Sequence, residues 1–352
     1  MQLCTHDHLL LLQRAGFELE IVGFDTTYTI VTRALNRLDG RGYRRMIPSD
    51  LSQAVVNAVE RKRARFVFLN EADFTFLAIH LRKKLGDTVK LIHLSHGLHS
   101  TDMLILQQIQ RTQKGTSEFD GRVAKALGAK LQFEADYRRV LDAAVCISPL
   151  DMELERWLGV NQVQWFSRLI REPMLVSSPI DRRVGCVSTL DHIPNRDGLT
   201  RLFESIEREG IGEIRIRLVG RPKKVGQEFA SRFNFVEYLG ILGSEDLRTE
   251  AASWCCFVHP IFHYARGCST KIAVALGWGI PIVTTHEGVR GYVWNEQILR
   301  LAANSKQLTE MLSTQMLRKN FAESQQNTRS IAEMQPSIED LSGRLATFLT
   351  SV

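Results

Sequence analysis

The clearest prediction of the fold comes from residues 255–291, with the sequence CCFVHPIFHYARGCSTKIAVALGWGIPIVTTHEGVRG. Two short apolar runs, Cys255–Val258 and Ile280–Thr284, predict strands of a parallel sheet that is covered on both faces. Between them the sequence predicts a loop and then a helix that begins near Ser269 and ends at Gly279. A strand, a helix and a second strand in this order are typical of an α/β protein.

The loop of this stretch suits an anion. It joins the carboxyl end of the first strand to the amino end of the helix, where unpaired backbone N–H groups, the positive end of the helix dipole and the Lys271 ammonium would converge. A glycine in the loop would let the backbone approach a ligand closely. We therefore expect a diphosphate to bind at Gly267, Cys268, Ser269, Thr270 and Lys271.

The same stretch resembles the donor-binding segment of the GT-B glycosyltransferases of the family-4 type, the glycosyl transferases group 1. In that family a proline closes a strand, a glycine-containing loop leads to a helix with a lysine, and Gly-x-Pro precedes the next strand. The matching residues are Pro260, Gly267, Lys271, Gly279, Pro281 and Ile282–Val283. The resemblance implies two Rossmann-like α/β domains that face each other across a cleft, with a C-terminal helix that returns to the first domain.

Length and composition agree with a two-domain globular protein. A chain of 352 residues is longer than a single core usually allows, and its 44% hydrophobic and 24% charged residues are ordinary for a globular protein. We expect an acceptor-side domain at 1–172, a donor-binding domain at 173–335 and a returning helix at 336–352. The six cysteines have no paired spacing, and the sequence shows neither a long apolar run nor a secretory signal, so we expect a cytoplasmic protein with reduced thiols.

The net charge of +6 is moderate, and basic residues cluster at Arg61–Arg65, Arg82–Lys84 and Arg221–Lys224. Solvated helix and loop ends explain the first two clusters. The alternative is peripheral attraction to anionic lipid headgroups, worth about 1 kcal/mol per basic residue near a membrane. Nucleic acid is not an expected partner, because no basic stripe is interleaved with aromatic residues.

Residues 1–170 alternate helix-like and strand-like segments, which predicts a mostly parallel sheet. Helices are expected at His6–Ala15, Asp50–Arg63, Phe74–Leu85 and after a Ser148 N-cap, and strands at Phe17–Phe24, Arg65–Leu69, Lys90–Ser95 and Ala143–Ile147. GT-B proteins open with a strand and a glycine-containing loop, whereas this sequence begins inside the following helix. The expectation is a first domain without that strand, either because the protein lacks it or because the sequence is truncated.

Three histidines follow each other at every third position, at His93, His96 and His99. His96 stands at the carboxyl end of a predicted strand, where ligands bind in open α/β sheets. The resemblance implies that a histidine here contacts the transferred sugar, so His96 is the expected catalytic residue. The alternatives are a core or loop histidine and a metal ligand, and no supporting Cys or acidic spacing favours the metal.

Residues 133–151 resemble the end of the first domain in this family, where a helix carrying a glutamate leads into an Asp-Ala-Val strand. The glutamate here is Glu134. We expect it to be a solvated helix residue.

The second half begins after a predicted linker at Arg171–Asp181. A strand at Val184–Ser188, a loop at Thr189–Gly198 and a helix at Leu199–Arg208 are expected to follow. Further on, strands are expected at Ile214–Gly220, Phe235–Leu239 and Leu299–Ala302, and helices at Glu245–Ser253, capped by Ser244, and Ile338–Leu349.

Further donor contacts are expected near the loop. Arg221 would project from a strand's carboxyl end toward the same crevice as Lys271 and share the diphosphate with it, or it is a solvated loop residue. The backbone around Ser188 would approach a phosphate, or is ordinary loop. Arg266, Glu287 and Gly288 are further candidates, the last two because they begin a Gly-x-x-Gly turn like that of the family.

One family feature is replaced. Retaining members carry Glu, seven residues and Glu across this loop and helix, one glutamate near the sugar and one on the ribose hydroxyls. The aligned positions hold Arg266 and Val274. Valine accepts no hydrogen bond, so another nucleotide pose, a different donor or a loss of catalysis follows, and the sequence assigns no stereochemistry.

Three functions are therefore weighed. The first is a metal- and cofactor-independent transfer of sugar from a nucleotide-diphosphate sugar to a glycan or lipid-linked acceptor, with the departing diphosphate stabilised by N–H groups and cations. The second is a non-catalytic relative that scaffolds or regulates a partner enzyme, which the replaced glutamates and the missing strand favour. The third is a sugar-nucleotide epimerase, for which no acid/base pair of residues stands out.

Overall fold

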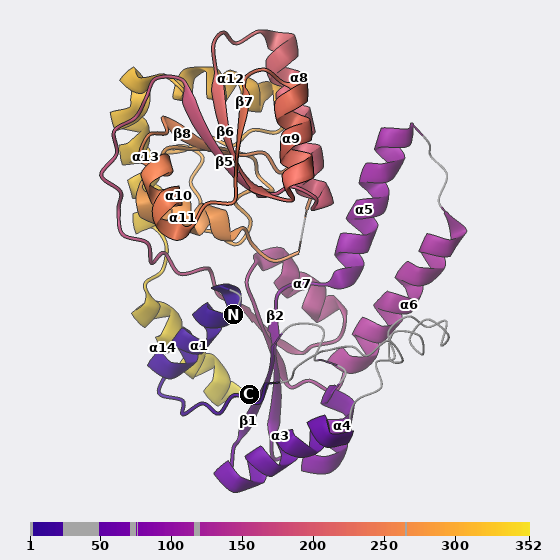
Figure 1. The fold of residues 1–352 in the computed structure, drawn as a ribbon. Coiled ribbons are helices and arrows are strands. Elements are labelled where there is room, and N and C mark those ends of the chain that lie inside the picture. The colour runs from indigo at the N-terminus through magenta and orange to yellow at the C-terminus, as the bar shows by residue number, and fades with distance from the viewer. Residues whose placement is uncertain (1–2, 24–48, 71–74, 76, 116–119, 265) are drawn as a thin grey trace. The chain divides into compact units, whose positions relative to one another are not determined.

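The computed structural model describes residues 3–23, 49–70, 75, 77–115, 120–264 and 266–352. The chain divides into two compact units (Figure 1). Unit 1 contains residues 1–166 and 337–352, and unit 2 contains residues 167–336. The last helix of the sequence thus belongs to the unit formed by the first half of the chain.

Unit 1 is built on a parallel sheet with the strand order β1-β2-β3-β4. Its strands are β1 (Phe66–Asn70), β2 (Lys90–Ser95), β3 (Ala143–Cys146) and β4 (Gln162–Trp165). Its helices are α1 (Leu3–Arg14), α3 (Ser49–Lys62), α4 (Leu77–Leu85), α5 (His99–Lys114), α6 (Gly121–Arg138), α7 (Pro149–Trp157) and α14 (Ile338–Ser351). The strands β2 and β3 are buried almost throughout because helices cover both of their faces, as expected for continuous apolar runs.

The C-terminal helix α14 packs against α1 inside unit 1. The Phe348 ring lies 6.4 Å from the Phe166 ring, and Arg344 Nη2 donates to the Trp165 carbonyl at 3.2 Å. A capping box at Ser337 and Asp340 fixes where the helix begins. Apolar burial and a firm N-terminus together hold this distant segment on the first half of the chain.

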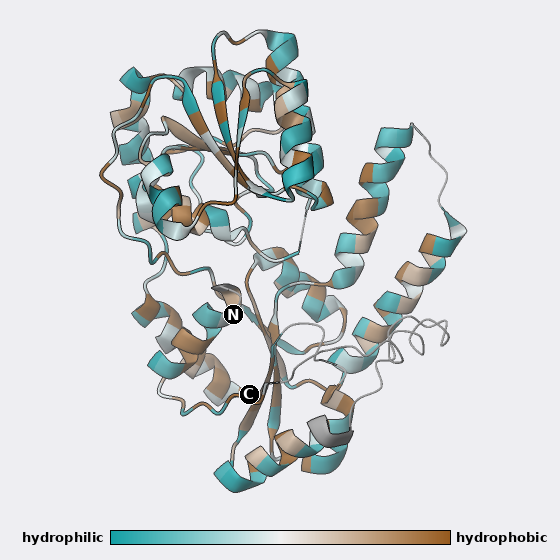
Figure 2. Ribbon diagram, in the orientation of Figure 1, coloured by the Kyte–Doolittle hydropathy of each residue, from teal (hydrophilic) through white to brown (hydrophobic). Residues whose placement is uncertain are grey.

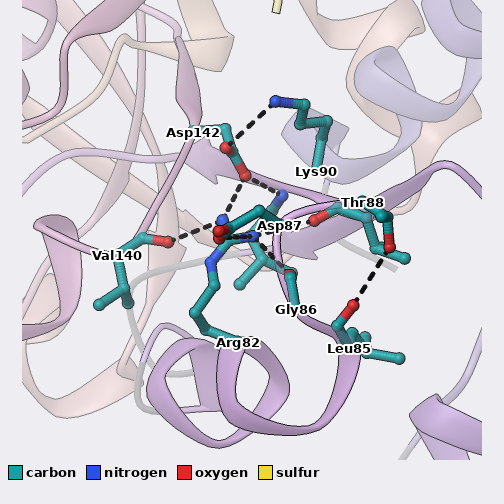
Figure 3. Close-up of polar contacts among 10 residues, drawn as sticks. Arg82, Leu85, Gly86, Asp87, Thr88, Lys90, Val140 and Asp142 are labelled. Carbon is teal, nitrogen blue, oxygen red and sulfur yellow. Dashed lines mark hydrogen bonds and ion pairs between the residues drawn. The ribbon is translucent and has the colours of Figure 1, made fainter.

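Arg82 is not a solvated residue, which corrects the expectation for this member of the cluster, whereas Lys83 and Lys84 are exposed as expected. The Arg82 guanidinium is mostly buried and donates to the carbonyls of Gly86, Val89 and Val140 and to the carboxylate of Asp142, as Figure 3 shows. Asp142 also accepts from the Leu91 backbone N–H at 2.7 Å. Arg82 therefore joins the end of α4 to the starts of β2 and β3.

Unit 2 is built on a second parallel sheet, with the strand order β7-β6-β5-β8-β9. Its strands are β5 (Arg183–Thr189), β6 (Arg215–Arg221), β7 (Val236–Gly240), β8 (Cys256–His259) and β9 (Ile282–Thr284). Its helices are α8 (Ile193–Glu209), α9 (Lys223–Arg232), α10 (Ser244–Ala251), α11 (Thr270–Trp278), α12 (Ser305–Gln315), the 3₁₀ turn η2 (Arg318–Asn320) and α13 (Phe321–Glu333). Residues 255–291 thus form β8, α11 and β9 in the predicted order.

Two apolar clusters cover the two faces of this sheet. One is formed with α8, α9 and α12 and is centred on Phe203, and the other is formed with α10, α11 and α13 and contains Trp254 and Trp278. The central strands are accordingly apolar, as the brown segments in Figure 2 show. A buried sheet of this kind presents its loops at the carboxyl ends of the strands.

Phe17–Phe24 was expected to be a strand, and this is wrong for the residues of it that the structure describes, 17–23, which form no ladder. The Phe17 ring instead contacts Phe66 and Phe68 of β1 at 5.7 and 6.5 Å. A largely apolar cavity of about 600 Å³ is lined both by Phe17–Gly23 and by β1. This segment therefore contacts β1 through the partly buried Phe17 side chain and not through backbone pairing.

Other predicted boundaries in the second half are also wrong. Helix α8 starts at Ile193, six residues early, because Pro194 suits the first helical turn. Ser244 is the first residue of α10, and Gly243 occupies its N-cap without a side-chain bond. Residues 299–302 form no strand, and only an isolated bridge joins Ala302 to Thr285.

Phe74, the expected start of α4, lies outside the described residues, and the described helix begins at Leu77.

Across the described ranges, the structure contains no helix that is both long and apolar enough to cross a bilayer.

Candidate functional site

A pocket of about 240 Å³ opens in unit 2 at the carboxyl ends of the neighbouring strands β5 and β8. It is lined by Thr189, His192, Asn195, His259, Ile261, Ser269, Lys271 and Arg290. These described lining residues include the basic side chains Lys271 and Arg290 and no acid. The pocket therefore presents a positive, hydrogen-bonding surface.

Two helices begin at this pocket, and neither has a side-chain cap. His192 is the N-cap of α8 and Ser269 that of α11, and the side chain of neither accepts a hydrogen bond from its first turn. The positive ends of both helix dipoles therefore border the pocket, which favours a bound anion. Asn195 holds the first of these turns closed by donating to the Thr189 carbonyl at 3.0 Å.

Tyr292 stabilises the start of α11 in place of a cap. Its hydroxyl donates to the Ser269 carbonyl and accepts from the Ala273 backbone N–H at 3.1 Å. The Ser269 side chain makes no cap, and among the described residues its Oγ has no hydrogen-bond partner although the residue is only 8% exposed.

Lys271 stands on the first turn of α11 and is half-buried. Burial lowers its pKa, and the Arg290 guanidinium acts in the same direction. The Cys186 thiol nearby supplies no negative charge, because burial raises its pKa to about 12. Among the described residues no carboxylate compensates the Lys271 ammonium, a condition that an anionic ligand would relieve.

Arg290 connects the two loops of the predicted donor segment. Its Nε donates to the Gly267 carbonyl at 2.9 Å, and its Nη1 donates to the Glu287 carbonyl at 2.6 Å. One side chain therefore fixes the loop before α11 against the turn after β9, and it brings a permanent charge to the pocket.

The turn after β9 is tightly packed. The backbone N–H of Gly288 donates to Thr285 Oγ1 at 3.1 Å, and a Cβ on Gly288 would lie 2.1 Å from Thr284 Oγ1. Thr285 in turn donates to the Ile261 carbonyl, and Ile261 lines the pocket. Glycine is required at position 288 so that the turn can close on the β8 loop.

His259 ends strand β8 and is 4% exposed, and its Nε2 has no hydrogen-bond partner within the part of the chain that the structure describes. Burial lowers the pKa of His259 well below its usual range, and Lys271 and Arg290 lower it further. The imidazole is therefore neutral at pH 7 and carries one N–H donor.

The structure brings some of the predicted donor residues together. Ser269 and Lys271 line the pocket, while Gly267 and Glu287 are joined through Arg290 and Gly288 shapes the adjacent turn. Cys268 and Thr270 lie on the same loop, and Arg266 is a half-buried residue at its start; these three are not among the lining residues.

Arg221 and Ser188 are also not lining residues. Arg221 is exposed at the end of β6, paired in register with Thr189 of β5, and Ser188 lies one position earlier, facing Gly220. Both stand at the correct edge of the sheet, but Arg221 is one strand removed from the strands that form the pocket.

Sequence reasoning missed His259, Arg290 and Asn195 as site residues. A signal existed for the first two, since His259 closes the decisive strand and Arg290 is a cation in the loop after the next strand. Only the folded arrangement shows that they meet Lys271 in one pocket.

In unit 1, His96 is half-buried in the turn that follows β2, and its ring lies 5.5 Å from the His8 ring. Gly97, with φ +91°, reverses the chain after it. His93 is fully buried within β2 and points to Glu155, with 3.4 Å between its Nδ1 and the carboxylate. No group of three or more metal-ligating side chains occurs within the described part of the chain.

Two buried glutamates hold the turn that carries His96, and Glu134 is one of them. It is fully buried, which corrects the expectation of a solvated residue, and its Oε1 accepts the backbone N–H groups of His99 and Ser100 at 2.9 and 3.3 Å. It therefore caps α5 with a carboxylate supplied by α6. Residue spacing alone does not indicate this long-range contact.

The second carboxylate is Glu155 of α7. It accepts from Ser95 Oγ at 2.7 Å and from Arg138 at 2.9 and 3.1 Å, and Ser95 Oγ accepts the Gly97 N–H at 3.2 Å. Burial alone would raise the pKa of Glu155, but Arg138 and His93 outweigh it and hold the pKa far below its usual range. An ion pair in the core thus fixes the other side of the turn.

A match to a protein-family model covers the segment that forms the pocket. Residues 181–317, which include β5 to β9 and the whole pocket, match the family model of the glycosyl transferases group 1. The matched region lies inside unit 2. A comparison of the whole sequence with curated proteins gives no match.

Solved structures extend the likeness to both units. The chain is similar to S. aureus TarM in complex with UDP, with a TM-score of 0.60 and 10% identity over 85% of this chain and 58% of TarM. It is also similar to the pneumococcal O-GlcNAc transferase GtfA, with a TM-score of 0.56 and 11% identity over 84% of this chain and 59% of GtfA. The chain has the GT-B fold.

A further GT-B structure with similar coverage of this chain is Anabaena HepE in complex with UDP. Its TM-score is 0.59 and its identity 14%, over 86% of this chain and 82% of HepE. The chain thus spans about three fifths of the length of TarM and GtfA and most of the length of HepE. The resemblance of residues 255–291 to the family-4 type is confirmed.

Proposed function

We propose that this GT-B protein transfers a sugar from a nucleoside-diphosphate sugar to a hydroxyl group of a glycan or lipid-linked acceptor. The observation that supports it is the pocket of unit 2, where Lys271, Arg290 and two uncapped helix N-termini meet without an acidic side chain among the described lining residues. The family match of residues 181–317 favours a sugar donor among anionic ligands.

In the proposed reaction, the bond between the sugar's anomeric carbon and the diphosphate oxygen breaks, and a bond to the acceptor oxygen forms. The acceptor hydroxyl loses its proton, and the diphosphate leaves with increased negative charge. Lys271, Arg290 and the backbone N–H groups of α11 would stabilise that charge, because they are held in place before the reaction starts. The proposal uses no metal ion or cofactor.

His96 is the proposed contribution of unit 1, as a contact to the transferred sugar. Its support is the position at the carboxyl end of β2, in a turn held on both sides by the buried carboxylates of Glu155 and Glu134. A turn constrained in this way would keep the imidazole in one orientation.

Thermal unfolding of the whole chain in the presence of UDP-, GDP-, ADP- and dTDP-sugars tests the proposal. A ligand at 100 times its Kd stabilises the folded state by about 2.7 kcal/mol, which is readily seen as a rise in Tm. The proposal predicts such a rise for one of the four nucleotides, followed by release of that nucleotide diphosphate with an acceptor. No change in Tm with any of them would contradict it.

The second candidate is a non-catalytic GT-B protein that scaffolds or regulates a partner enzyme. The residues that favour it are Arg266 and Val274, which stand where retaining members carry glutamates. It predicts binding of a nucleoside diphosphate without turnover, or no binding at all, in the same measurements.

A further inference from the structure

Two buried polar groups of the donor pocket have no hydrogen-bond partner among the described residues. They are Nε2 of His259, a residue 4% exposed, and Oγ of Ser269, a residue 8% exposed. Both residues line the pocket beside Lys271 and Arg290. Because a buried polar atom without a partner is costly, an anion that accepted hydrogen bonds from both groups would stabilise the pocket.

Neighbouring residues fix the backbone on which each group stands. Tyr292 bonds the Ser269 carbonyl and the Ala273 N–H at the start of α11, and the Ser269 hydroxyl makes no cap. The His259 carbonyl accepts from Thr284 Oγ1 at 2.8 Å, so the backbone of this residue is fixed where it lines the pocket. Among the described residues, His259 Nε2 and Ser269 Oγ have no bond of their own.

We infer that His259 and Ser269 are phosphate-binding residues, each donating a neutral hydrogen bond to an oxygen of the donor's diphosphate. The inference rests on the proposed function and adds two contacts to it. A third and fourth cation in a pocket of this size would repel Lys271 and Arg290, whereas an imidazole N–H and a hydroxyl add donors without adding charge.

The neutral state of the imidazole agrees with this role. Burial, Lys271 and Arg290 all lower the pKa of His259, so at pH 7 the ring does not compete with the cations for the anion. The cations would supply most of the attraction, and the neutral donors would fix the orientation of the phosphate oxygens.

Isothermal titration with inorganic pyrophosphate and with UDP tests the inference on the whole chain. The variants are Ser269→Ala, which removes only the hydroxyl, and His259→Leu, with His259→Gln as a milder change that keeps an amide donor. Ser313→Ala, on the exposed face of α12, and His286→Ala, an exposed histidine, are the matched controls. Far-UV circular dichroism and Tm verify that each variant is folded.

We expect Ser269→Ala and His259→Leu each to weaken pyrophosphate and UDP binding about 10-fold, as for hydrogen bonds to charged groups, with a smaller loss for His259→Gln and none for the controls. Variants that bind both ligands as tightly as the wild type would overturn the inference alone. Weakened pyrophosphate binding without any sugar transfer would support the inference and count against the proposed function. A wild-type protein that binds neither ligand would overturn both.

Discussion

Gly198 and Gly343 are both helical glycines, yet their surroundings predict opposite effects of the same substitution. A Cβ on Gly198 would lie 1.7 Å from the Pro260 carbonyl oxygen, whereas a Cβ on Gly343 would have no atom within 4 Å. Gly198 lets α8 contact the β8 loop, which leads to the pocket. We expect Gly198→Ala to destabilise the protein by about 1–3 kcal/mol and Gly343→Ala to stabilise it by about 0.5–1 kcal/mol.

Urea denaturation of the two glycine variants measures these changes. Helix propensity favours alanine equally at both positions, so the difference between them isolates the backbone contact. A Gly198→Ala protein as stable as the Gly343→Ala protein would mean that α8 does not touch Pro260 as described.

The buried histidines predict how stability depends on pH. The folded-state pKa values of His93 and His259 are lowered, so the unfolded chain binds protons that the folded chain does not. The contribution of each histidine to the free energy of unfolding is then fully present above the unfolded pKa near 6.5. It is lost as the pH decreases toward the folded-state pKa, by at most about 1.4 kcal/mol per pH unit for each histidine. The lowered pKa of Glu155 contributes at more acidic pH, below the usual pKa range of a glutamate.

Chemical denaturation between pH 7.5 and 5 tests this dependence. His259→Leu is expected to reduce the slope, because it removes one of the two groups, and His286→Ala, an exposed histidine, is expected to leave it unchanged. Equal slopes for His259→Leu and the wild type would show that His259 is protonated in the folded protein.

At the scale of elements, Glu155 carries the ion pair that joins α6, α7 and the turn after β2. Glu155→Gln would leave the fully buried Arg138 without its counter-charge, so we expect a loss of about 3–5 kcal/mol. Glu153, two residues earlier on α7, forms an exposed pair with Arg156, and Glu153→Gln should change stability by less than about 1 kcal/mol.

A double-mutant cycle with Arg138→Met and Glu155→Leu distinguishes the pair from its parts. Because a buried pair replaced by apolar side chains often costs little, the double variant should be more stable than Glu155→Gln. A single Glu155→Gln variant that unfolds like Glu153→Gln would contradict the burial of this pair.

The sequence predicted most elements whose signal is local. β2 was predicted at its observed bounds, and the Ser148 cap of α7 is present, because apolar runs and capping residues act within a few positions. Phe17–Phe24 has a strand-like pattern, but pairing depends on a partner strand that the pattern does not contain. The early start of α8 was missed because Pro-Asn-x-Asp-Gly suits a loop as well as a first helical turn.

The candidate site was predictable only in part for a similar reason. Ser269 and Lys271 stand at the N-cap and in the first turn of α11 and follow from a contiguous motif. Arg290, His259 and Asn195 come from three other segments, and their meeting depends on the strand order of the sheet. Glu134 and Glu155 were not recognised because their partners lie 34–35 and 17–60 residues away.

At the scale of the whole molecule, each unit has a sheet and an apolar core of its own, and the proposed donor chemistry belongs to unit 2 alone. The family match also falls within unit 2, whereas unit 1 supplies the proposed His96 contact. We therefore expect His96→Ala to lower turnover while leaving the affinity for UDP within about twofold of the wild type, since it removes no group of the unit 2 pocket. Steady-state kinetics together with titration of UDP measure the two effects separately.

Titration of UDP, GDP and ADP into the Lys271→Met protein measures whether Lys271 stands at a diphosphate-binding pocket. Lys306→Met on α12, where the lysine is exposed, is the matched control. We predict that the wild type and Lys306→Met bind one of the three nucleotides equally well, and that Lys271→Met binds it at least 10-fold more weakly, because a charge-assisted contact is lost. Unchanged affinity in the Lys271→Met protein would show that Lys271 does not contact the bound diphosphate.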